Sequence, residues 1–197
     1  MLASDAFSFA LRARRSILPR VLALAVLVAS APTRAEPLVA TPVDRAAIEA
    51  CLKLVDENGQ KQAQKPDADE TPGAIGRLAA AAKEAATESE SCVGAVTIPC
   101  QQEPGGYSTA GMVACNTREW AAWDERLNRA YRKSQENASS KLATAMREAQ
   151  RAWLQWREKR CKLPEIENEG GTIVGPLYTS CMLDTTARQA LWLESRQ

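Results

Sequence analysis

The chain has 197 residues, a formal net charge of +1, six cysteines and no histidine. A net charge so close to zero argues against a nucleic-acid-binding domain, which carries a strongly basic face. Because the chain lacks histidine and any C-x-x-C pair, no metal site and no cofactor are expected. An even number of cysteines in an exported chain predicts disulfide bonds instead.

Residues 1–35 have the pattern of a signal peptide. Several arginines precede an apolar stretch at residues 21–31, and Thr33-Arg34-Ala35 offers a small-x-small cleavage site. The stretch is shorter than the roughly 20 residues that span a bilayer. We therefore expect a periplasmic or secreted protein without a stable membrane anchor after cleavage. Residues 1–35 hold five of the 25 basic and one of the 24 acidic residues, so the mature chain would have a net charge of −3.

Residues 36–99 predict an alanine-rich, acidic extension with two helices and no aromatic side chain. The first helix is expected to begin at the N-cap Thr41 and to stop at Asn58-Gly59. The second helix is expected over about residues 74–90. Helices of this length are marginal alone in water, so something must dock or tie them.

Residues 100–197 predict three more helices, over about residues 108–134, 139–161 and 177–194. A short turn near Ala138 makes the first two an antiparallel hairpin, and no segment shows convincing strand alternation. The predicted fold is therefore all-α: a disulfide-stapled helical hairpin plus a third helix, preceded by the two-helix extension. Five side chains of the second hairpin helix are expected to face inward: Leu142, Met146, Ala149, Trp153 and Trp156.

The six cysteines predict three disulfides. A bond between Cys51 and Cys92 would join the two helices of the extension and contribute about 3–4 kcal/mol through chain entropy. Local bonds are predicted for the other four cysteines, although the hairpin register also permits a second pairing. The two sets are Cys100–Cys115 with Cys161–Cys181, or Cys115–Cys161 with Cys100–Cys181.

Polar residues share a face with aromatic residues on both helices of the hairpin. Asp124 and Asn128 lie on the first helix, and Gln150 and Arg157 lie on the second. These four could bind a ligand, but a buried, structural polar seam between the two helices is the favoured interpretation. A carboxylate beside a permanently charged guanidinium is a poor acid–base pair, so no catalytic residue and no enzymatic activity are expected. Four tryptophans at helical spacing favour a core over a sugar-binding shelf: Trp120, Trp123, Trp153 and Trp156.

The segment after the hairpin is acidic and contains two adjacent glycines. Glu165, Glu167 and Glu169 precede Gly170-Gly171, and cysteines lie on both sides of the segment. Loops held by a rigid scaffold commonly carry binding function, and three glutamates would attract a basic partner. A solvated acidic loop without a partner is the alternative interpretation, and the acidic extension is a second candidate contact surface.

The motifs of residues 92–195 resemble the lysozyme-inhibitor-like domain family of bacterial secreted proteins, the LprI type. The resemblance rests on cysteine, aromatic and polar residues that occur in the family's order, within Met112–Tyr131, Ala149–Cys161, Gly170–Thr172 and Cys181–Leu191. It implies a small helical domain in the periplasm or outside the cell. The expected organisation is a signal peptide (1–35), a helical extension (36–99) and a lysozyme-inhibitor-like domain (100–197).

The expected function is that of an exported, non-catalytic binding protein. The resemblance implies an inhibitor of lysozyme or of another cell-wall hydrolase, whose basic surface would suit the acidic segment. The alternative is a structural or assembly factor of the bacterial envelope with no hydrolase target.

Overall fold

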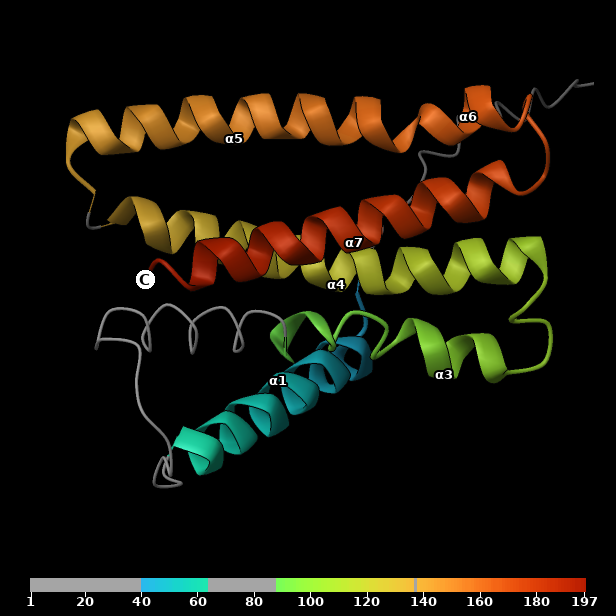
Figure 1. Cartoon of the computed structure of the whole chain (residues 1–197), viewed down its shortest axis with the longest axis horizontal. Helices are drawn as coiled ribbons and strands as arrows, with labels where there is room; N and C mark the ends of the chain where they lie inside the picture. Colours follow the sequence, from blue (N-terminus) through green and yellow to red (C-terminus); the bar gives the residue numbers. More distant parts are fainter. Residues whose placement is uncertain (1–39, 64–87, 137) are drawn as a thin grey trace, which may run out of the picture. The chain divides into compact units, whose positions relative to one another are not determined.

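The computed structural model describes residues 40–63, 88–136 and 138–197. All regular structure in these residues is α-helical, which confirms the predicted fold class (Figure 1). The helices are α1 (Pro42–Ala63), α3 (Thr97–Gln102), α4 (Thr109–Glu136), α5 (Ser140–Cys161), α6 (Leu163–Glu167) and α7 (Val174–Glu194). The predicted signal peptide and most of the second predicted helix of the extension lie outside the described residues. None of the described helices is long and apolar enough to cross a bilayer.

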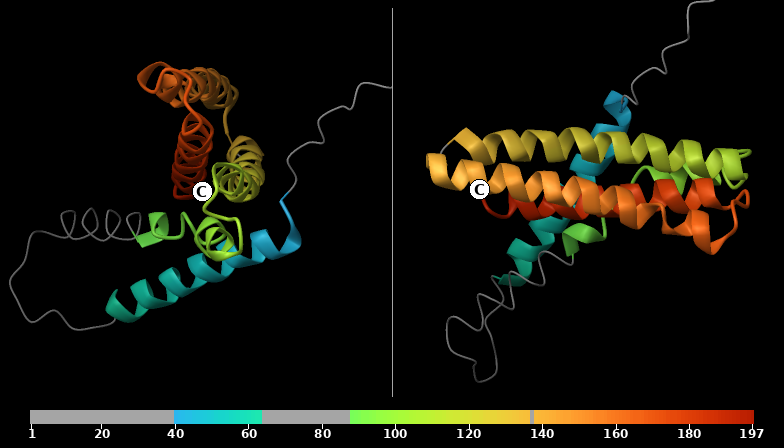
Figure 2. Two further views of the ribbon diagram at one scale, coloured as in Figure 1. Left: turned by 90° about the vertical axis from the view of Figure 1, so that its right-hand side faces the viewer. Right: turned by 90° about the horizontal axis from the view of Figure 1, so that it is seen from above.

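The main core lies between α4 and α7, which pack side by side (Figures 1 and 2). Trp123 and Leu127 of α4 and Leu183 and Leu193 of α7 are almost completely buried. Small side chains on both helices let the two backbones approach closely, and dense packing of this kind is typical of a protein interior. These small residues are Ala121, Ala122, Ala130, Ala187 and Ala190.

Helix α5 follows α4 through a short turn, as predicted, but it packs mainly on α7. It buries only three side chains, Gln150, Arg157 and Cys161. The expectation that Leu142, Ala149 and Trp156 face inward is wrong, because all three are exposed. The reason is that the apolar face of α4 packs against α7, so little apolar surface of α4 remains for α5 to cover.

The described part of the extension shares the main core. Ile48 of α1, together with Cys92 and Val96, belongs to the buried cluster that contains Trp123. A disulfide joins Cys51 to Cys92, with the two Cα atoms 5.7 Å apart, as predicted. Helix α1 is therefore held by burial and by a covalent bond, which its marginal intrinsic stability requires.

The predicted stop of α1 at Asn58-Gly59 is wrong, because the helix continues to Ala63. A glycine inside a helix costs only about 1 kcal/mol, so neighbouring interactions can override it. Pairs one helical turn apart support this exposed stretch: Gln60 Nε2 donates to Asp56 Oδ2 over 3.0 Å, and Lys53 lies 3.8 Å from Glu57.

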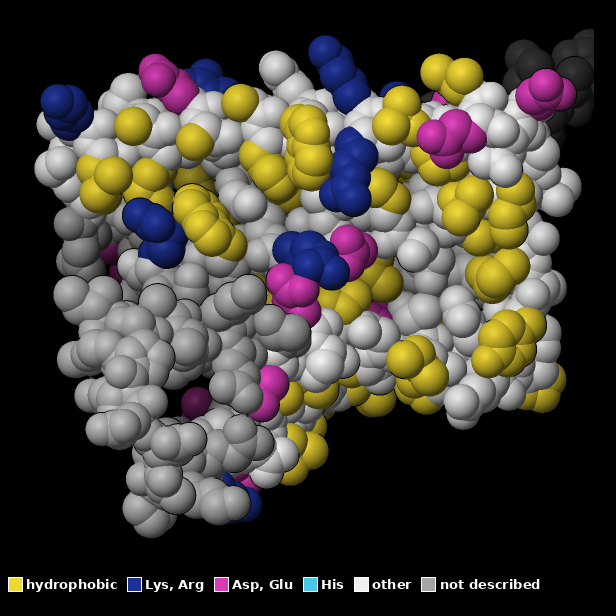
Figure 3. Space-filling model, in the orientation of Figure 1, with side chains coloured by type: hydrophobic (Ala, Val, Ile, Leu, Met, Phe, Trp, Pro, Cys, Tyr) yellow, Lys and Arg dark blue, Asp and Glu magenta, His cyan; other side chains and the backbone are white. Residues whose placement is uncertain are grey.

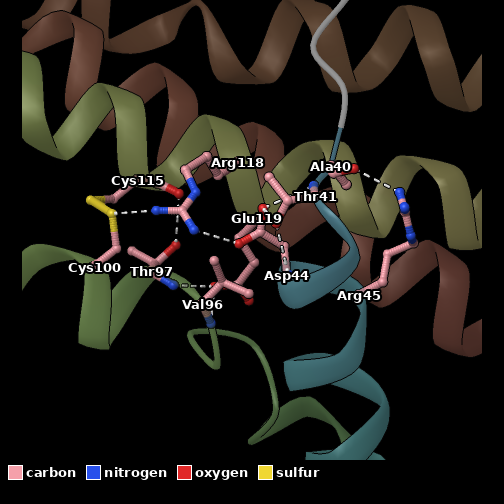
Figure 4. A network of polar contacts seen from close by, with 10 residues as sticks. All are labelled: Ala40, Thr41, Asp44, Arg45, Val96, Thr97, Cys100, Cys115, Arg118 and Glu119. Atoms are coloured by element: carbon pink, nitrogen blue, oxygen red, sulfur yellow. Dashed lines mark hydrogen bonds and ion pairs between the residues drawn. A yellow bond between two sulfur atoms is a disulfide. The ribbon is translucent and has the colours of Figure 1, made fainter.

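Polar contacts hold the start of α1 on α4 (Figure 4). Thr41 and Asp44 form a reciprocal capping box, in which the Asp44 N–H donates to Thr41 Oγ1 (3.1 Å) and the Thr41 N–H donates to Asp44 Oδ2 (3.0 Å). Arg118 Nη2 of α4 donates to Asp44 Oδ1 over 2.6 Å. Burial raises the pKa of Asp44, but the hydrogen bonds from Arg118 and Thr41 outweigh it and lower the pKa overall, so the carboxylate stays charged at neutral pH.

Glu119 of α4 is completely buried and anchors the residues before α3 (Figure 4). Its Oε1 accepts from the Gly94 N–H (2.6 Å) and from Trp123 Nε1 (3.1 Å). Its Oε2 accepts from the Val96 N–H (3.0 Å) and the Thr97 N–H (2.7 Å). A buried charge is costly unless its hydrogen bonds are complete, and here four donors complete them. Glu119 therefore satisfies backbone N–H groups at the start of α3, where no side-chain cap is present.

Candidate functional site

Two further disulfides tie the helices of residues 100–197. Cys100–Cys115 joins α3 to α4, and Cys161–Cys181 joins the end of α5 to α7, with Cα–Cα distances of 5.7 and 5.4 Å. The local pairing predicted from the sequence is confirmed, and all six cysteines are bonded. Three disulfides indicate a location outside the reducing cytoplasm.

Two of the residues predicted for the polar seam, Gln150 and Arg157 of α5, make their side-chain hydrogen bonds to α7. Gln150 Oε1 accepts from Gln189 Nε2 of α7 over 3.0 Å, and Arg157 Nη1 donates to Thr186 Oγ1 of α7 over 2.7 Å. These hydrogen bonds reach α7 because α7 covers most of the buried face of α5. Gln150 and Arg157 thus fix how α5 lies on α7.

Arg157 of α5 contacts both α4 and α7. Its Nη1 lies 3.7 Å from Asp124 Oδ1 of α4, and its guanidinium faces the rings of Trp153 (4.8 Å) and Trp120 (6.0 Å). Burial lowers the pKa of the guanidinium, and the charge of Asp124 opposes that shift. Such a group remains charged in proteins, so the arrangement suits a bridge between helices.

The tryptophans of the hairpin do not all lie in the core. Trp123 is completely buried, whereas Trp120 and Trp153 are partly buried and pack against the core. Trp156 is 49% exposed and lies beneath the guanidinium of Arg160 at 5.2 Å. The expectation of a common core for the four residues is therefore wrong for Trp156.

Asn128 does not belong to the buried seam. Its side chain is exposed, and its Nδ2 donates to Asp124 Oδ2 of the same helix over 2.9 Å. Asn128 is thus linked to the seam only through Asp124, and its exposure could not be predicted from its position in the sequence.

Gln150 and Asn128 provide a matched test of the seam. Gln150→Ala should lower the free energy of unfolding by about 1–2 kcal/mol, because the half-buried amide of Gln189 loses its acceptor. Asn128→Ala should stay within about 0.5 kcal/mol of the parent, as exposed substitutions usually do. Urea denaturation of the disulfide-bonded protein measures both values. Equal losses for the two variants would contradict a seam between α5 and α7.

The acidic segment, residues 165–171, forms part of a short helix and a hydrogen-bonded turn, where the sequence predicted a loop between cysteines. Its first residues belong to α6, and α7 begins already at Val174. The Gly170 N–H donates to the Glu165 carbonyl (3.1 Å) and the Glu169 N–H donates to the Ile166 carbonyl (3.4 Å), the paired bonds of a Schellman motif. The Cys161–Cys181 disulfide ties the two helices on either side of this acidic turn.

The acidic turn carries exposed carboxylates next to an exposed isoleucine. Glu165, Glu167 and Glu169 are all exposed, and Ile166 between them is 79% exposed, the highest value among the large hydrophobic side chains described. Figure 3 shows acidic and hydrophobic side chains beside each other at the upper right, over α6. An apolar centre with a polar rim is the usual anatomy of a protein interface. The sequence prediction named the glutamates but missed Ile166.

Glu169 has a backbone conformation that normally favours glycine. Its φ is 49°, and it is the only non-glycine residue with a positive φ among the described residues. The left-handed region costs a residue with a Cβ atom about 1–2 kcal/mol, and glycine is the usual residue at this position of a Schellman motif. Strain that is kept on an exposed turn points to a use for the side chain.

Replacing this glutamate tests whether strain is stored in the turn. Glu169→Gly should raise the free energy of unfolding by about 0.5–1 kcal/mol, since the relieved strain exceeds the added chain entropy of glycine. Glu167→Gly, two residues earlier in α6, should lower it by about 1 kcal/mol. Thermal unfolding of both variants compares the two positions. A loss of stability at both positions would show that the turn is unstrained.

The structure and these sites define a small, disulfide-stapled, all-α domain with an exposed acidic turn. Among the described residues, no group of three or more His, Cys, Asp or Glu side chains is arranged to hold a metal ion. Residues 100–193 match the family model described as lysozyme inhibitor LprI. No curated protein and no solved structure matches the chain. The matched residues include the acidic turn and both disulfides of residues 100–197, while α1 lies outside the match.

Proposed function

We propose that the chain is an exported, non-catalytic binding protein that inhibits lysozyme or another basic cell-wall hydrolase. The family of residues 100–193 supports inhibition as the activity. Three disulfides and the signal-peptide pattern of residues 1–35 support export to the periplasm or beyond it. The partner is then a protein that works on the cell wall in the same compartment.

The acidic turn is the observation that carries this proposal. A lysozyme cleft holds two working carboxylates within a generally basic surface. Glu165, Glu167 and Glu169 steer the inhibitor towards the basic surface, and Ile166 becomes desolvated at the contact. Electrostatic attraction sets the association rate, whereas a buried apolar anchor sets most of the affinity.

The tip of the turn consists of two glycines without side chains. Gly170 has no neighbouring atom within 4 Å of the position that a Cβ would occupy, and Gly171 meets only the Asn168 carbonyl oxygen, at 3.2 Å. The Gly170-Gly171 pair therefore projects backbone without side chains. In the proposed complex this tip enters the cleft while the glutamates contact its basic rim.

Cell-wall turnover by lysozyme, with a molar excess of the disulfide-bonded protein, tests the proposal directly. Turnover should fall, and the triple change of Glu165, Glu167 and Glu169 to Gln should slow association by about tenfold at low salt. The triple change of the exposed residues Glu103, Glu136 and Glu148 to Gln is the matched control, because it removes the same charge elsewhere. A control that slows association as much as the turn variant would refute a role for the acidic turn.

Unchanged cell-wall turnover in the presence of the unmodified protein would contradict inhibition itself. If chicken-type and goose-type lysozymes are both unaffected, the inhibitor proposal fails. The alternative of a structural or assembly factor of the bacterial envelope then remains.

A further inference from the structure

An apolar pocket of about 300 Å³ lies between α4, α5 and α7, close to the turn from α4 to α5. Tyr131, Met146 and Trp153 form its walls, Leu193 is a deeply buried part of its lining, and Trp192 stands half exposed beside it. This volume is at the lower end of the range for small-molecule sites, which are mostly apolar. The pocket therefore suits a single small apolar group.

Contacts with neighbouring side chains fix the walls of this apolar pocket. The Arg157 guanidinium lies 4.8 Å from the Trp153 ring, and Gln135 Nε2 donates to Met146 Sδ over 3.8 Å. The hydrogen bond from Gln189 to Gln150, both of which line the pocket, ties α7 to α5. Because these contacts hold the walls in place, little ordering cost opposes binding.

One end of the pocket carries positive charge. A second hollow, of about 290 Å³, shares Met146 and Trp192 with the pocket and is lined by the exposed residues Lys133 and Arg196. Arg196 lies 5.0 Å from the centre of the Trp192 ring, so its charge is next to the mouth. None of the described residues that line either hollow has an acidic side chain. Their chemistry is complementary to a molecule with an apolar body and an anionic head.

We propose that this apolar pocket binds one medium-chain fatty acid. Its hydrocarbon chain lies among Met146, Trp153 and Leu193, and its carboxylate lies at the mouth beside Arg196 and Lys133. The small volume admits one chain, and the two cations suit an anionic head group. The inference does not depend on lysozyme inhibition, because the pocket is lined by α5 residues Met146 to Trp153, whereas α6 follows the C-terminal end of α5 (Figure 1).

Binding of dodecanoate to the disulfide-bonded, delipidated protein tests the proposal. Tryptophan fluorescence and titration calorimetry, both below the micelle concentration, should show one bound molecule per chain. Dodecyltrimethylammonium has the same hydrocarbon chain and the opposite charge, and it should bind more weakly. Ala149→Phe places a ring on the lining of the pocket and should abolish binding, while circular dichroism confirms that the helices remain.

Two arginines offer a matched pair for the head group. Arg196→Gln should weaken dodecanoate binding by about two- to fivefold, as the loss of one exposed charge contact does. Arg160→Gln removes an arginine that faces an exposed tryptophan at 5.2 Å elsewhere on the molecule, and it should leave binding unchanged. Equal weakening by both changes would overturn the placement of the carboxylate.

Three results would overturn the proposal as a whole. They are no dodecanoate binding, binding only where micelles form, and binding that Ala149→Phe leaves intact. A dimer that shields Trp192 and excludes dodecanoate would show that a second copy of the chain covers this groove instead. An Ile166→Ala variant that still binds dodecanoate, whatever its effect on lysozyme, supports two separate sites.

Discussion

Glu119→Gln should lower the free energy of unfolding by about 3 kcal/mol or more, although the side chain keeps its shape. One carboxylate oxygen becomes an NH₂ group, and two N–H donors that it served then face another donor. Each unsatisfied buried donor costs about 1–3 kcal/mol, and bonds to a charged acceptor are the stronger ones. The loss is large against a total stability of about 5–15 kcal/mol.

The Glu119→Gln change should also loosen one part of the protein before the whole protein unfolds. Glu119 holds the backbone of Gly94, Val96 and Thr97, and Cys92 in the same segment is bonded to α1. Hydrogen exchange should therefore accelerate first in residues 92–100 and in α1, whereas α4 and α7 keep their protection.

Glu125→Gln on the same helix is the control for Glu119→Gln. Its side chain is 35% exposed and lies 3.1 Å from Arg45, so its loss should cost less than about 1 kcal/mol. Urea denaturation without reductant compares the two variants. Equal midpoints would mean that the buried carboxylate does not anchor the segment before α3.

The long helices and the two short-range disulfides could be predicted because their signals are local. Ser139 accepts a hydrogen bond from the Leu142 N–H (3.3 Å), as expected for the residue before a helix. The choice of packing partner is not local. Helix α5 rests on α7 because the alanines of α4 and α7 let these two helices close on each other, and periodicity alone does not rank such pairs.

A pattern in the sequence indicates that Glu119 is buried. Cys115, Glu119 and Trp123 lie at i, i+4 and i+8, so a carboxylate falls within the buried stripe of α4. A charge in that position demands partners. Three of its four partners could not be predicted, because they are backbone N–H groups of Gly94, Val96 and Thr97, whose place on α4 is fixed by tertiary packing.

At the acidic turn, too, the sequence predicts the residues but not their tertiary arrangement. Its glutamates are visible in the sequence, but the Schellman bonds, the left-handed Glu169 and the exposure of Ile166 arise from how α6 meets α7. An isoleucine between two glutamates is equally compatible with a buried anchor of the loop. Only the fold decides that it faces solvent.

If the chain inhibits lysozyme through the acidic turn as proposed, Ile166→Ala should raise the inhibition constant by about 30-fold or more. An apolar anchor buried at the centre of an interface commonly contributes 2 kcal/mol or more, which corresponds to that factor. Because Ile166 is exposed in the free protein, its truncation should leave the melting temperature unchanged.

The kinetics distinguish the isoleucine from the glutamates around it. Ile166→Ala should act on the dissociation rate and leave the salt dependence of association intact, whereas the triple glutamate change should do the reverse.

Leu54→Ala is the matched control for the isoleucine, since Leu54 is 61% exposed on α1, outside the family match. It should not change inhibition. If Leu54→Ala weakens inhibition and Ile166→Ala does not, the contact surface is the extension, and the acidic turn only attracts the partner.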